Sequence, residues 1–256
     1  MKKIILAILF LTAIFVSCKK DQKEDNPPDN SLTPVQQQWG FALNYTATWC
    51  FYCGQWGAPL IHQFADTGNV VAITAHAQGD PMYNSALYGN LSAVRPDGGG
   101  IPSFWVGDIA TTDIASMTAL LAQSPVAAIA IQSEKIGDSL SVNTKVRFYE
   151  AGSGEFYLSV LILEDGIDGS GSAGEYAQNG TSNPDTYCHD FVLMASNAGG
   201  NAYGEMILSN PEAGTEITKH YSIYVSGSWV NIYPVAILWR LDMFGYPVYS
   251  FVNAVK

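Results

Sequence analysis

The stretch NYTATWCFYCGQW (residues 44–56) contains two cysteines, Cys50 and Cys53, separated by two residues. Its first residues end the apolar run GFALNYTA (40–47), which predicts a β-strand. Its last residues begin FYCGQWGAPLIHQFAD (51–66), whose apolar residues recur at helical spacing. The cysteines are therefore expected where a strand gives way to a helix. Such a pair has three interpretations: a redox-active pair, half of a metal site, or a disulfide that only links the chain.

Cys50 is the expected nucleophile if the pair is redox-active. The free N–H groups and the dipole at a helix N-terminus favour the thiolate, which is the attacking species in disulfide exchange. Cys53, one turn further on and facing inward, would resolve the mixed disulfide, and Trp49 would form a wall of the site. Phe51 and Tyr52 add no positive charge, so we expect a modest depression of the thiol pKa and a potential near the reducing end.

The sequence argues against a metal site but leaves the inert disulfide open. A zinc site needs about four ligands, and the chain has no second Cys-x-x-Cys and no histidine pair at ligand spacing, so no metal is expected. A peroxiredoxin would carry threonine three residues before its cysteine, where Ala47 stands. The run Cys188-His189-Asp190 lies on a predicted strand, whose side chains alternate between faces, so the three are not expected to converge. An inert Cys50–Cys53 disulfide stays open.

A second element, GGGIPSFW (98–105), places a proline before a short predicted strand. This order of elements resembles thioredoxin-like folds, in which a cis-proline lies beside the disulfide. The resemblance implies that the Ile101–Pro102 bond is cis and that the backbone of Ile101 pairs with an extended substrate segment. One departure is that Pro59 lies six residues after Cys53, whereas five is usual in such folds.

The pattern of apolar residues changes near Pro125. Before it, strand and helix alternate: NVVAITAHA (69–77) reads as a strand buried on both faces, and the segments 82–94 and 111–123 read as helices. After it the period is two, and LSVNTKVRF places one apolar face at Leu140, Val142, Thr144, Val146 and Phe148. Five more strands are expected in FYLSVLILED, HDFVLMAS, HYSIYVSG, YPVAILWRL and YPVYSFVNAV. This pattern is typical of an antiparallel sandwich. The loop 165–187 is long enough to be mobile or functional.

The N-terminus predicts export. A basic MKK precedes IILAILFLTAIFV (4–16), an apolar run too short to span a bilayer of roughly 30 Å but typical of a signal peptide. Ser17 and Cys18 follow, which resembles the lipobox of bacterial lipoproteins. We expect removal of residues 1–17 and a lipid on Cys18, with an uncleaved anchor as the alternative. The polar, proline-containing segment 18–34 is expected to be a flexible tether.

The net charge of the chain and its expected export limit the classes of partner that it can bind. The chain carries a net charge of −11, which becomes −13 if Lys2 and Lys3 are removed with the signal peptide. The mature chain has no basic stretch beyond the start of the tether, which argues against nucleic acid. With 48% hydrophobic residues, the remainder should be globular. An exported protein can keep Cys50–Cys53 as a disulfide and leaves Cys188 as an odd thiol.

Several strings together resemble the outer-membrane-protein-28 family of lipoproteins: the lipobox, the aromatic-bearing Cys-x-x-Cys, HAQGDPM, YCHDFVLMASNAGGNAYGEMI and the terminal FVNAV. The resemblance implies an α+β protein anchored in the cell outer membrane. It would have a thioredoxin-like domain (35–124) followed by an antiparallel immunoglobulin-like β-sandwich (125–256). Two functions remain. One is a cofactor-free thiol–disulfide oxidoreductase acting on exported protein thiols and disulfides. The other is a non-catalytic binding or adhesion lipoprotein with an unidentified surface partner.

Overall fold

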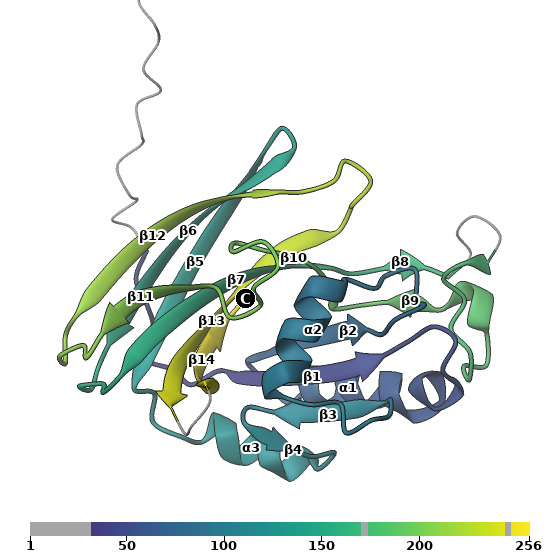
Figure 1. Cartoon of the computed structure of the whole chain (residues 1–256), viewed down its shortest axis with the longest axis horizontal. Coiled ribbons are helices and arrows are strands. Elements are labelled where there is room, and N and C mark those ends of the chain that lie inside the picture. Colours follow the sequence, from purple (N-terminus) through teal and green to yellow (C-terminus); the bar gives the residue numbers. More distant parts are fainter. Residues whose placement is uncertain (1–31, 170–173, 244–246) are drawn as a thin grey trace, which may run out of the picture.

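The computed structural model describes residues 32–169, 174–243 and 247–256 (Figure 1). The predicted signal peptide and the lipid on Cys18 lie outside these residues. The predicted tether, 18–34, ends too late, because Leu32 and Pro34 are already buried and the Tyr149 hydroxyl donates to the Pro34 carbonyl at 2.9 Å. Within the described ranges, no helix has the length and apolar character needed to cross a membrane.

A mixed nine-stranded sheet joins the two halves of the sequence. Its main path runs β14-β13-β7-β10-β2-β1-β3-β4, with β11 paired to β7. The bounds are β1 (Gly40–Thr46), β2 (Val70–His76), β3 (Ser103–Val106), β4 (Ile109–Ala110), β7 (Glu155–Glu164), β10 (Val192–Ser196), β11 (Glu205–Ser209), β13 (Ile232–Met243) and β14 (Pro247–Val255). β1 runs parallel to β2 and antiparallel to β3, and β10 continues the sheet beside β2.

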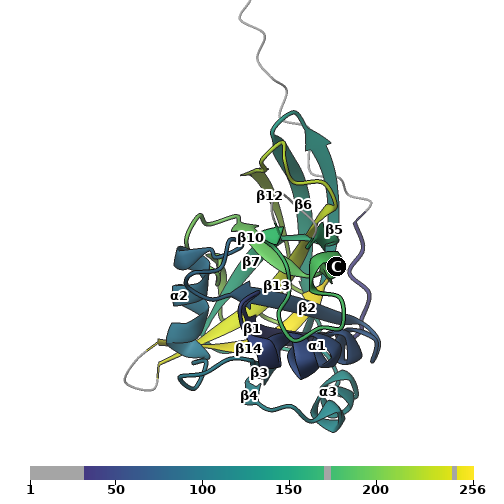
Figure 2. The same ribbon diagram turned by 90° about the vertical axis from the view of Figure 1, so that its right-hand side faces the viewer.

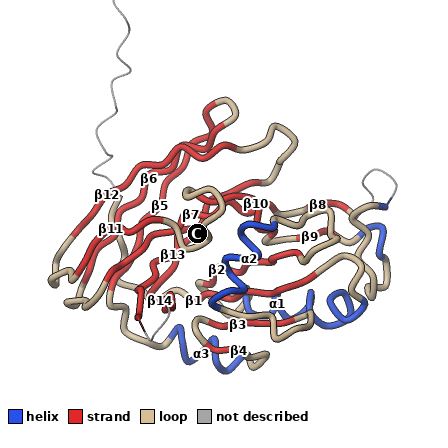
Figure 3. The backbone as a smooth tube through the Cα atoms, viewed as in Figure 1, coloured by secondary structure: helices blue, strands red, loops and turns tan. Residues whose placement is uncertain are grey.

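Helices gather at one end of this sheet (Figure 3). The π-helical turn η1 (Cys53–Gly57) leads directly into α1 (Ala58–Ala65), and α1 and α3 (Ile114–Leu121) pack on one face of β1, β2 and β3. The helix α2 (Ser85–Val94) covers the opposite face through Leu87 and Leu91. A π-helical turn accommodates one extra residue in a helix. This turn therefore explains why Pro59 lies six residues after Cys53.

The other end of the molecule contains only strands. A three-stranded sheet, β5 (Ala127–Ile136), β6 (Ser139–Phe148) and β12 (Glu216–Tyr224), packs on the larger sheet; Figure 2 shows this layer beside β7 and β13. The predicted face of β6 is confirmed, since Leu140, Val142, Thr144, Val146 and Phe148 are all buried. The sequence reading missed β5 and β11.

β7 and β13 are buried on both faces and contribute to the cores at both ends of the molecule. Leu158, Val160 and Ile162 of β7 face the three-stranded sheet, whereas Leu161 and Leu163 enter the core that contains β1, β2 and α2. This is why FYLSVLILED is nearly continuously apolar. The mixture of strands and helices is consistent with an α+β fold. The prediction of a sandwich confined to residues 125–256 needs correction, because one layer of it is part of the sheet that begins with β1.

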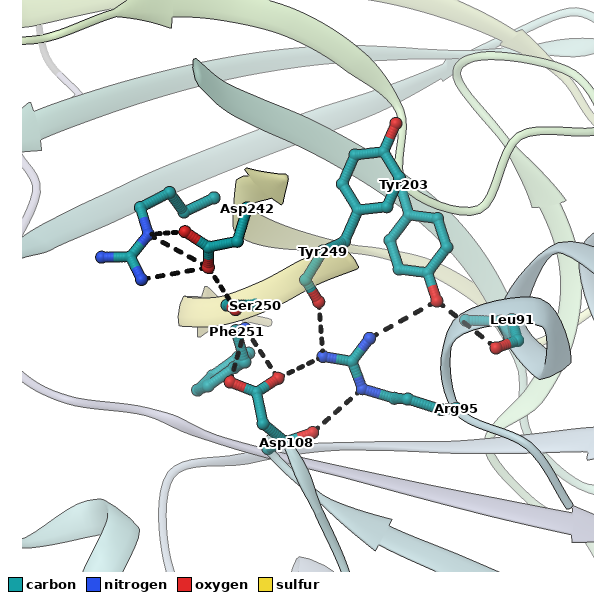
Figure 4. A network of polar contacts seen from close by, with 10 residues as sticks. Leu91, Arg95, Asp108, Tyr203, Asp242, Tyr249, Ser250 and Phe251 are labelled. Atoms are coloured by element: carbon teal, nitrogen blue, oxygen red, sulfur yellow. Dashed lines mark hydrogen bonds and ion pairs between the residues drawn. The ribbon is translucent and has the colours of Figure 1, made fainter. Parts of the chain in front are cut away.

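A buried arginine fixes the junction between the two halves (Figure 4). Arg95 ends α2 and is 1% exposed. Its guanidinium donates to Asp108 in the β3–β4 turn, to the Gly107 carbonyl at 3.0 Å and to the Tyr249 carbonyl of β14 at 2.9 Å. It also lies over the Trp239 ring of β13, 4.6 Å from the centroid. A single side chain thus connects a helix, a hairpin turn and two strands from the second half.

Candidate functional site

The two cysteines form a disulfide at the start of the first helix, with Cα atoms 5.2 Å apart. Cys50 is 8% exposed and Cys53 is fully buried, so the order of accessibility agrees with the order expected from the sequence. The Cys53 backbone N–H points at Cys50 Sγ at 3.2 Å. In the reduced protein such a donor would stabilise a Cys50 thiolate, since a hydrogen bond to the charged form favours it.

The segment before β3 completes the immediate surroundings of the disulfide. The Ile101–Pro102 bond is cis, as predicted, and the Ile101 carbonyl oxygen lies 3.6 Å from Cys50 Sγ. Among the described residues, the Ile101 N–H has no hydrogen-bond partner.

Exposed aromatic residues flank the two cysteines in the chain. Trp49 is 53% exposed, Phe51 and Tyr52 are exposed by half or more, and Trp56 is partly exposed with its ring packed on Phe104. Phe51 and Tyr52 contact one another edge to face at 5.6 Å. Contiguous exposed apolar side chains are a common feature of binding surfaces.

The long loop of the second half packs on the cysteine loop. η3 (Pro184–Thr186) and the short pair β8 (Ile167–Asp168) and β9 (Cys188–His189) shape it. The buried Gln178 side chain donates to the carbonyls of Ala47, Thr48 and Cys50 at 3.1–3.3 Å. The Asn179 N–H donates to the Thr48 carbonyl at 2.8 Å.

Glycines allow this close approach. Gly180 has φ +86°, and a Cβ there would collide with the Phe51 carbonyl; a Cβ on Gly54 would collide with the Asn179 carbonyl. The described part of the loop, from residue 174 onward, is therefore part of the site.

The buried residues Asp80 and His76 support the cysteine loop. Asp80 accepts hydrogen bonds from the backbone N–H groups of Thr48 and Met82. His76 Nδ1 lies 3.1 Å from Asp80 Oδ2, an ion-pair distance, although the geometry is not that of a linear hydrogen bond. Burial alone would raise the pKa of Asp80, but His76 and the two N–H donors outweigh it and hold that pKa below its usual value.

The remaining histidines near the site take different positions. His189 is buried, its ring contacts the His76 ring edge to face at 5.6 Å, and its Nε2–H donates to the Tyr176 carbonyl at 2.7 Å. Burial and the neighbouring His76 lower the pKa of His189 to about 4. Cys188 is exposed, so the run 188–190 does not converge on one point. His62 is a surface residue 3.6 Å from Asp190.

The site therefore contains more than the sequence indicated. The structure brings Cys50, Cys53 and Ile101 into contact, and the role of Trp49 as a wall of the site stays a prediction. Gln178 and the His76–Asp80 pair were missed as parts of the site. HAQGDPM contains both members of that pair, so it held a signal, whereas nothing near Gln178 marks it. No group of three or more His, Cys, Asp or Glu side chains in the described ranges is arranged to hold a metal ion.

Comparisons with known proteins give one structural relationship. No family model matches the chain, and no curated protein matches it. Among solved structures, HBP35 of Porphyromonas gingivalis is similar, with a TM-score of 0.64 and 16% sequence identity over 87% of this chain and 75% of that one. At this identity the similarity concerns the fold alone: this chain shares its α+β fold with HBP35 of Porphyromonas gingivalis.

Proposed function

We propose that the protein is a thiol–disulfide oxidoreductase of thioredoxin-like fold, held at the outer membrane by a lipid on Cys18. The observation that carries the proposal is the environment of Cys50 Sγ. It is the more accessible sulfur of the pair, it faces the Cys53 N–H at 3.2 Å, and the Ile101 carbonyl lies 3.6 Å away. A nucleophile, a donor that stabilises it and a backbone segment for the substrate are thus adjacent.

The fold supports the same proposal. The order β2-β1-β3-β4, with α1 and α3 on one face and α2 on the other, is the arrangement expected of a thioredoxin-like half. The three-stranded sheet packed on β7 and β13 fits an immunoglobulin-like sandwich that has become continuous with that half. Membership of the outer-membrane-protein-28 family belongs to this proposal, and so does an exported protein as the substrate.

A binding function is the second candidate, and the exposed aromatic side chains favour it. Trp49, Phe51, Tyr52 and Trp56 would contact a surface partner whether or not the disulfide exchanges electrons. In that case the disulfide would only hold the aromatic residues in place.

Alkylation of the folded, reduced full chain at pH 7 separates the two. Cys188 is an exposed thiol and serves as an internal reference. We expect a short pulse of a small alkylating reagent to label Cys50 before Cys188, and Cys53 last, because Cys50 combines access with a stabilised thiolate. Cys53→Ala should trap mixed disulfides with exported proteins and Cys50→Ala should not. If neither Cys50 nor Cys53 is alkylated until the protein is denatured, the oxidoreductase function is ruled out and the binding function is left.

A further inference from the structure

The carboxyl ends of β1 and β2 carry polar residues on the face that α1 covers. Asn44 lies beside Thr74 in this parallel pair of strands, and Thr46 lies beside His76. All four residues are buried. Two positions earlier on each strand the same face carries alanine, which packs in the core beneath α1. Ligand sites of α/β sheets lie at the carboxyl ends of parallel strands, so we searched this end of the pair for a site.

A small pocket lies there, between the sheet, α1 and the long loop. Asn44, Thr46 and His76 line it from the sheet, and Gln178 and His189 line it from the loop. The space available to the centre of a water molecule is about 10 Å³. This is room for roughly one water, or for one nitrogen atom of similar size. The pocket can therefore receive a single small polar group.

A buried acceptor of this pocket, Asn44 Oδ1, has no donor in the described chain. Asn44 is 1% exposed. The donors nearby are used elsewhere: the Gln178 amide donates to carbonyls of the cysteine loop, and His189 Nε2–H donates to a backbone carbonyl. His76 Nδ1 faces Asp80 at 3.1 Å. Because buried polar atoms almost always have a partner, Asn44 Oδ1 requires a donor from outside the described chain.

An open groove adjoins the pocket on the solvent side. It has a volume of about 410 Å³ and lies between the first turns of the helix and residues 180–187 of the long loop. The groove and the pocket share Ala58, His62 and Tyr187 among their lining residues. Ala58, Pro59 and the Tyr187 ring supply apolar surface along the groove. A flexible side chain with an apolar stem could lie in the groove and extend its end into the pocket.

The charges on both walls of the groove favour a cation. Residues 165–191 contain five acidic side chains and no lysine or arginine. Residues 32–124 contain five aspartates and one arginine, Arg95, which is buried and paired. The Asp190 side chain itself lines the pocket. A surface of one sign attracts ligands of the opposite sign.

We propose that the groove and the pocket bind the side chain of a lysine from an exported polypeptide. Its methylene chain lies in the groove, and its ammonium group enters the pocket, donates to Asn44 Oδ1 and is neutralised by Asp190. The groove opens beside the disulfide, because Gly54, which lines it, donates its N–H to the Cys50 carbonyl at 3.4 Å. That this polypeptide is also a thiol substrate rests on the proposed oxidoreductase function, whereas the lysine site does not.

Other groups fit the pocket less well. A guanidinium group is a planar fork of three nitrogens and exceeds the room for one. The phosphate of a lipid headgroup amine would find no lysine or arginine between residues 165 and 191.

Two simpler occupants can be compared with this proposal. An ordered water would give Asn44 its donor, but it needs neither the groove nor the carboxylate of Asp190. The chain's own Lys256 is placed elsewhere, with its ammonium nitrogen 4.1 Å from the centroid of the Tyr233 ring.

The test is a binding titration of the full chain at pH 7 with the Cys50–Cys53 disulfide intact, followed by NMR. The probe is N-acetyl-lysine methylamide, and it is compared with its arginine and Nε-acetyl-lysine counterparts and with phosphoethanolamine. We expect the lysine probe to bind about tenfold or more tightly than each of the other three, because hydrogen bonds from a charged donor are the strong ones. It should also shift the side-chain amide signals of Asn44.

Two variants locate the bound ammonium group. Asn44→Leu removes the buried acceptor and keeps a side chain of similar volume, so the lysine probe should bind about tenfold more weakly. Asp190→Asn should weaken it to a similar degree, and it carries the test if Asn44→Leu does not fold. Asp185→Asn is the matched control: it removes the same charge from the same loop, but Asp185 is exposed and lines neither the pocket nor the groove. Its effect should stay below twofold.

Equal binding of the lysine and Nε-acetyl-lysine probes would overturn the lysine site, and so would equal affinities in Asp190→Asn and Asp185→Asn. A slowly exchanging water at Asn44 that the lysine probe never displaces would also overturn it. These measurements involve no thiol, so their failure leaves the oxidoreductase function standing. Failure of Cys50 to react with an alkylating reagent would, in turn, leave the lysine site standing.

Discussion

The helix-bearing end, built on β1 to β4, and the layer of β5, β6 and β12 differ in how completely their buried polar groups are paired. In the layer, β6 pairs along its whole length on both sides, and its alternate residues are buried. Both regions expose large apolar side chains, such as Tyr52 at the helix-bearing end and Tyr224 in the layer. In the described structure, however, the buried side-chain atoms without an aligned partner, Asn44 Oδ1 and His76 Nδ1, both lie at the helix-bearing end. Local departures from good packing concentrate at functional sites. The comparison therefore directs attention to the end that holds the disulfide.

Arg95 gives the largest expected effect, because it joins both regions. Arg95→Ala would leave the Gly107 and Tyr249 carbonyls without their donor and open a space beside Trp239. We expect a loss of about 2–5 kcal/mol in the free energy of unfolding, because buried carbonyls lose their donor and a cavity opens in the core, whereas the half-exposed Asp108 carboxylate adds little. Denaturant unfolding should show one transition by fluorescence and by circular dichroism, since β7 and β13 belong to both cores.

The matched control for this prediction is Arg147→Ala. Arg147 lies on the exposed side of β6, 3.4 Å from Glu216. Exposed ion pairs contribute little to stability. The denaturant midpoint of Arg147→Ala should therefore stay close to that of the parent protein. Two separate transitions in the parent protein would contradict the shared sheet as a cooperative unit.

The lowered pKa of His189, at the helix-bearing end, predicts that acid reduces the stability of the fold. Its folded pKa of about 4 lies below the ordinary 6.5, so folding favours the neutral ring. Above pH 6.5 both states are neutral and the stability is unaffected. As the pH falls from 6.5 to 4 the unfolded chain takes up the proton first, and stability should fall by on the order of 3 kcal/mol.

His189→Gln should flatten this slope, whereas His220→Gln on the exposed layer should not. Asp80, whose pKa is lowered, adds its own loss only below its ordinary value of 3.8. Unfolding free energies measured at half-unit steps of pH would separate the loss due to His189, between pH 6.5 and 4, from the loss due to Asp80, below pH 3.8. An unchanged slope in His189→Gln would contradict the assignment.

A glycine pair gives the smallest expected effect and isolates the contact between the long loop and the cysteine loop. Gly180 and Gly214 have nearly the same φ, +86° and +87°, but only Gly180 lies against a neighbour, the Phe51 carbonyl. Gly180→Ala should therefore cost about 1–2 kcal/mol more than Gly214→Ala, since both pay the same conformational cost. Thermal unfolding measures the difference, and hydrogen exchange at residues 47–54 should rise only in Gly180→Ala. Equal effects would mean that the loop does not hold the site.

Much of the helix-bearing end could be predicted because its signals are local. The β-branched run of β2, the cysteine spacing and the proline before β3 each lie within a few residues of the structure that they specify. The face of β6 was readable for the same reason. Cys50 and Cys53 could be placed from these short patterns, whereas the position of Ile101 and Pro102 beside them was expected from the resemblance to thioredoxin-like folds.

The missed features depend on contacts between distant residues. Gln178 reaches carbonyls some 130 positions earlier in the chain, and no local pattern records such a contact. The burial of β7 on both faces was visible in its apolar run, but which strands cover it was not. Continuity of the sheet through β10 is likewise set by tertiary packing, which overrides the change of period at Pro125.

An equilibrium redox titration of the folded full chain tests the central claim, that Cys50–Cys53 is an exchangeable pair. The protein, carrying Cys18→Ser and Cys188→Ser, would be equilibrated at pH 7 in glutathione and dithiothreitol buffers of stepped ratio, quenched and counted for free thiols by mass. We predict a single two-electron transition in the native state, closer to the roughly −270 mV of thioredoxin than to the roughly −120 mV of strongly oxidising proteins. A pair that stays oxidised at every ratio until the protein is denatured would contradict the account and identify an inert disulfide.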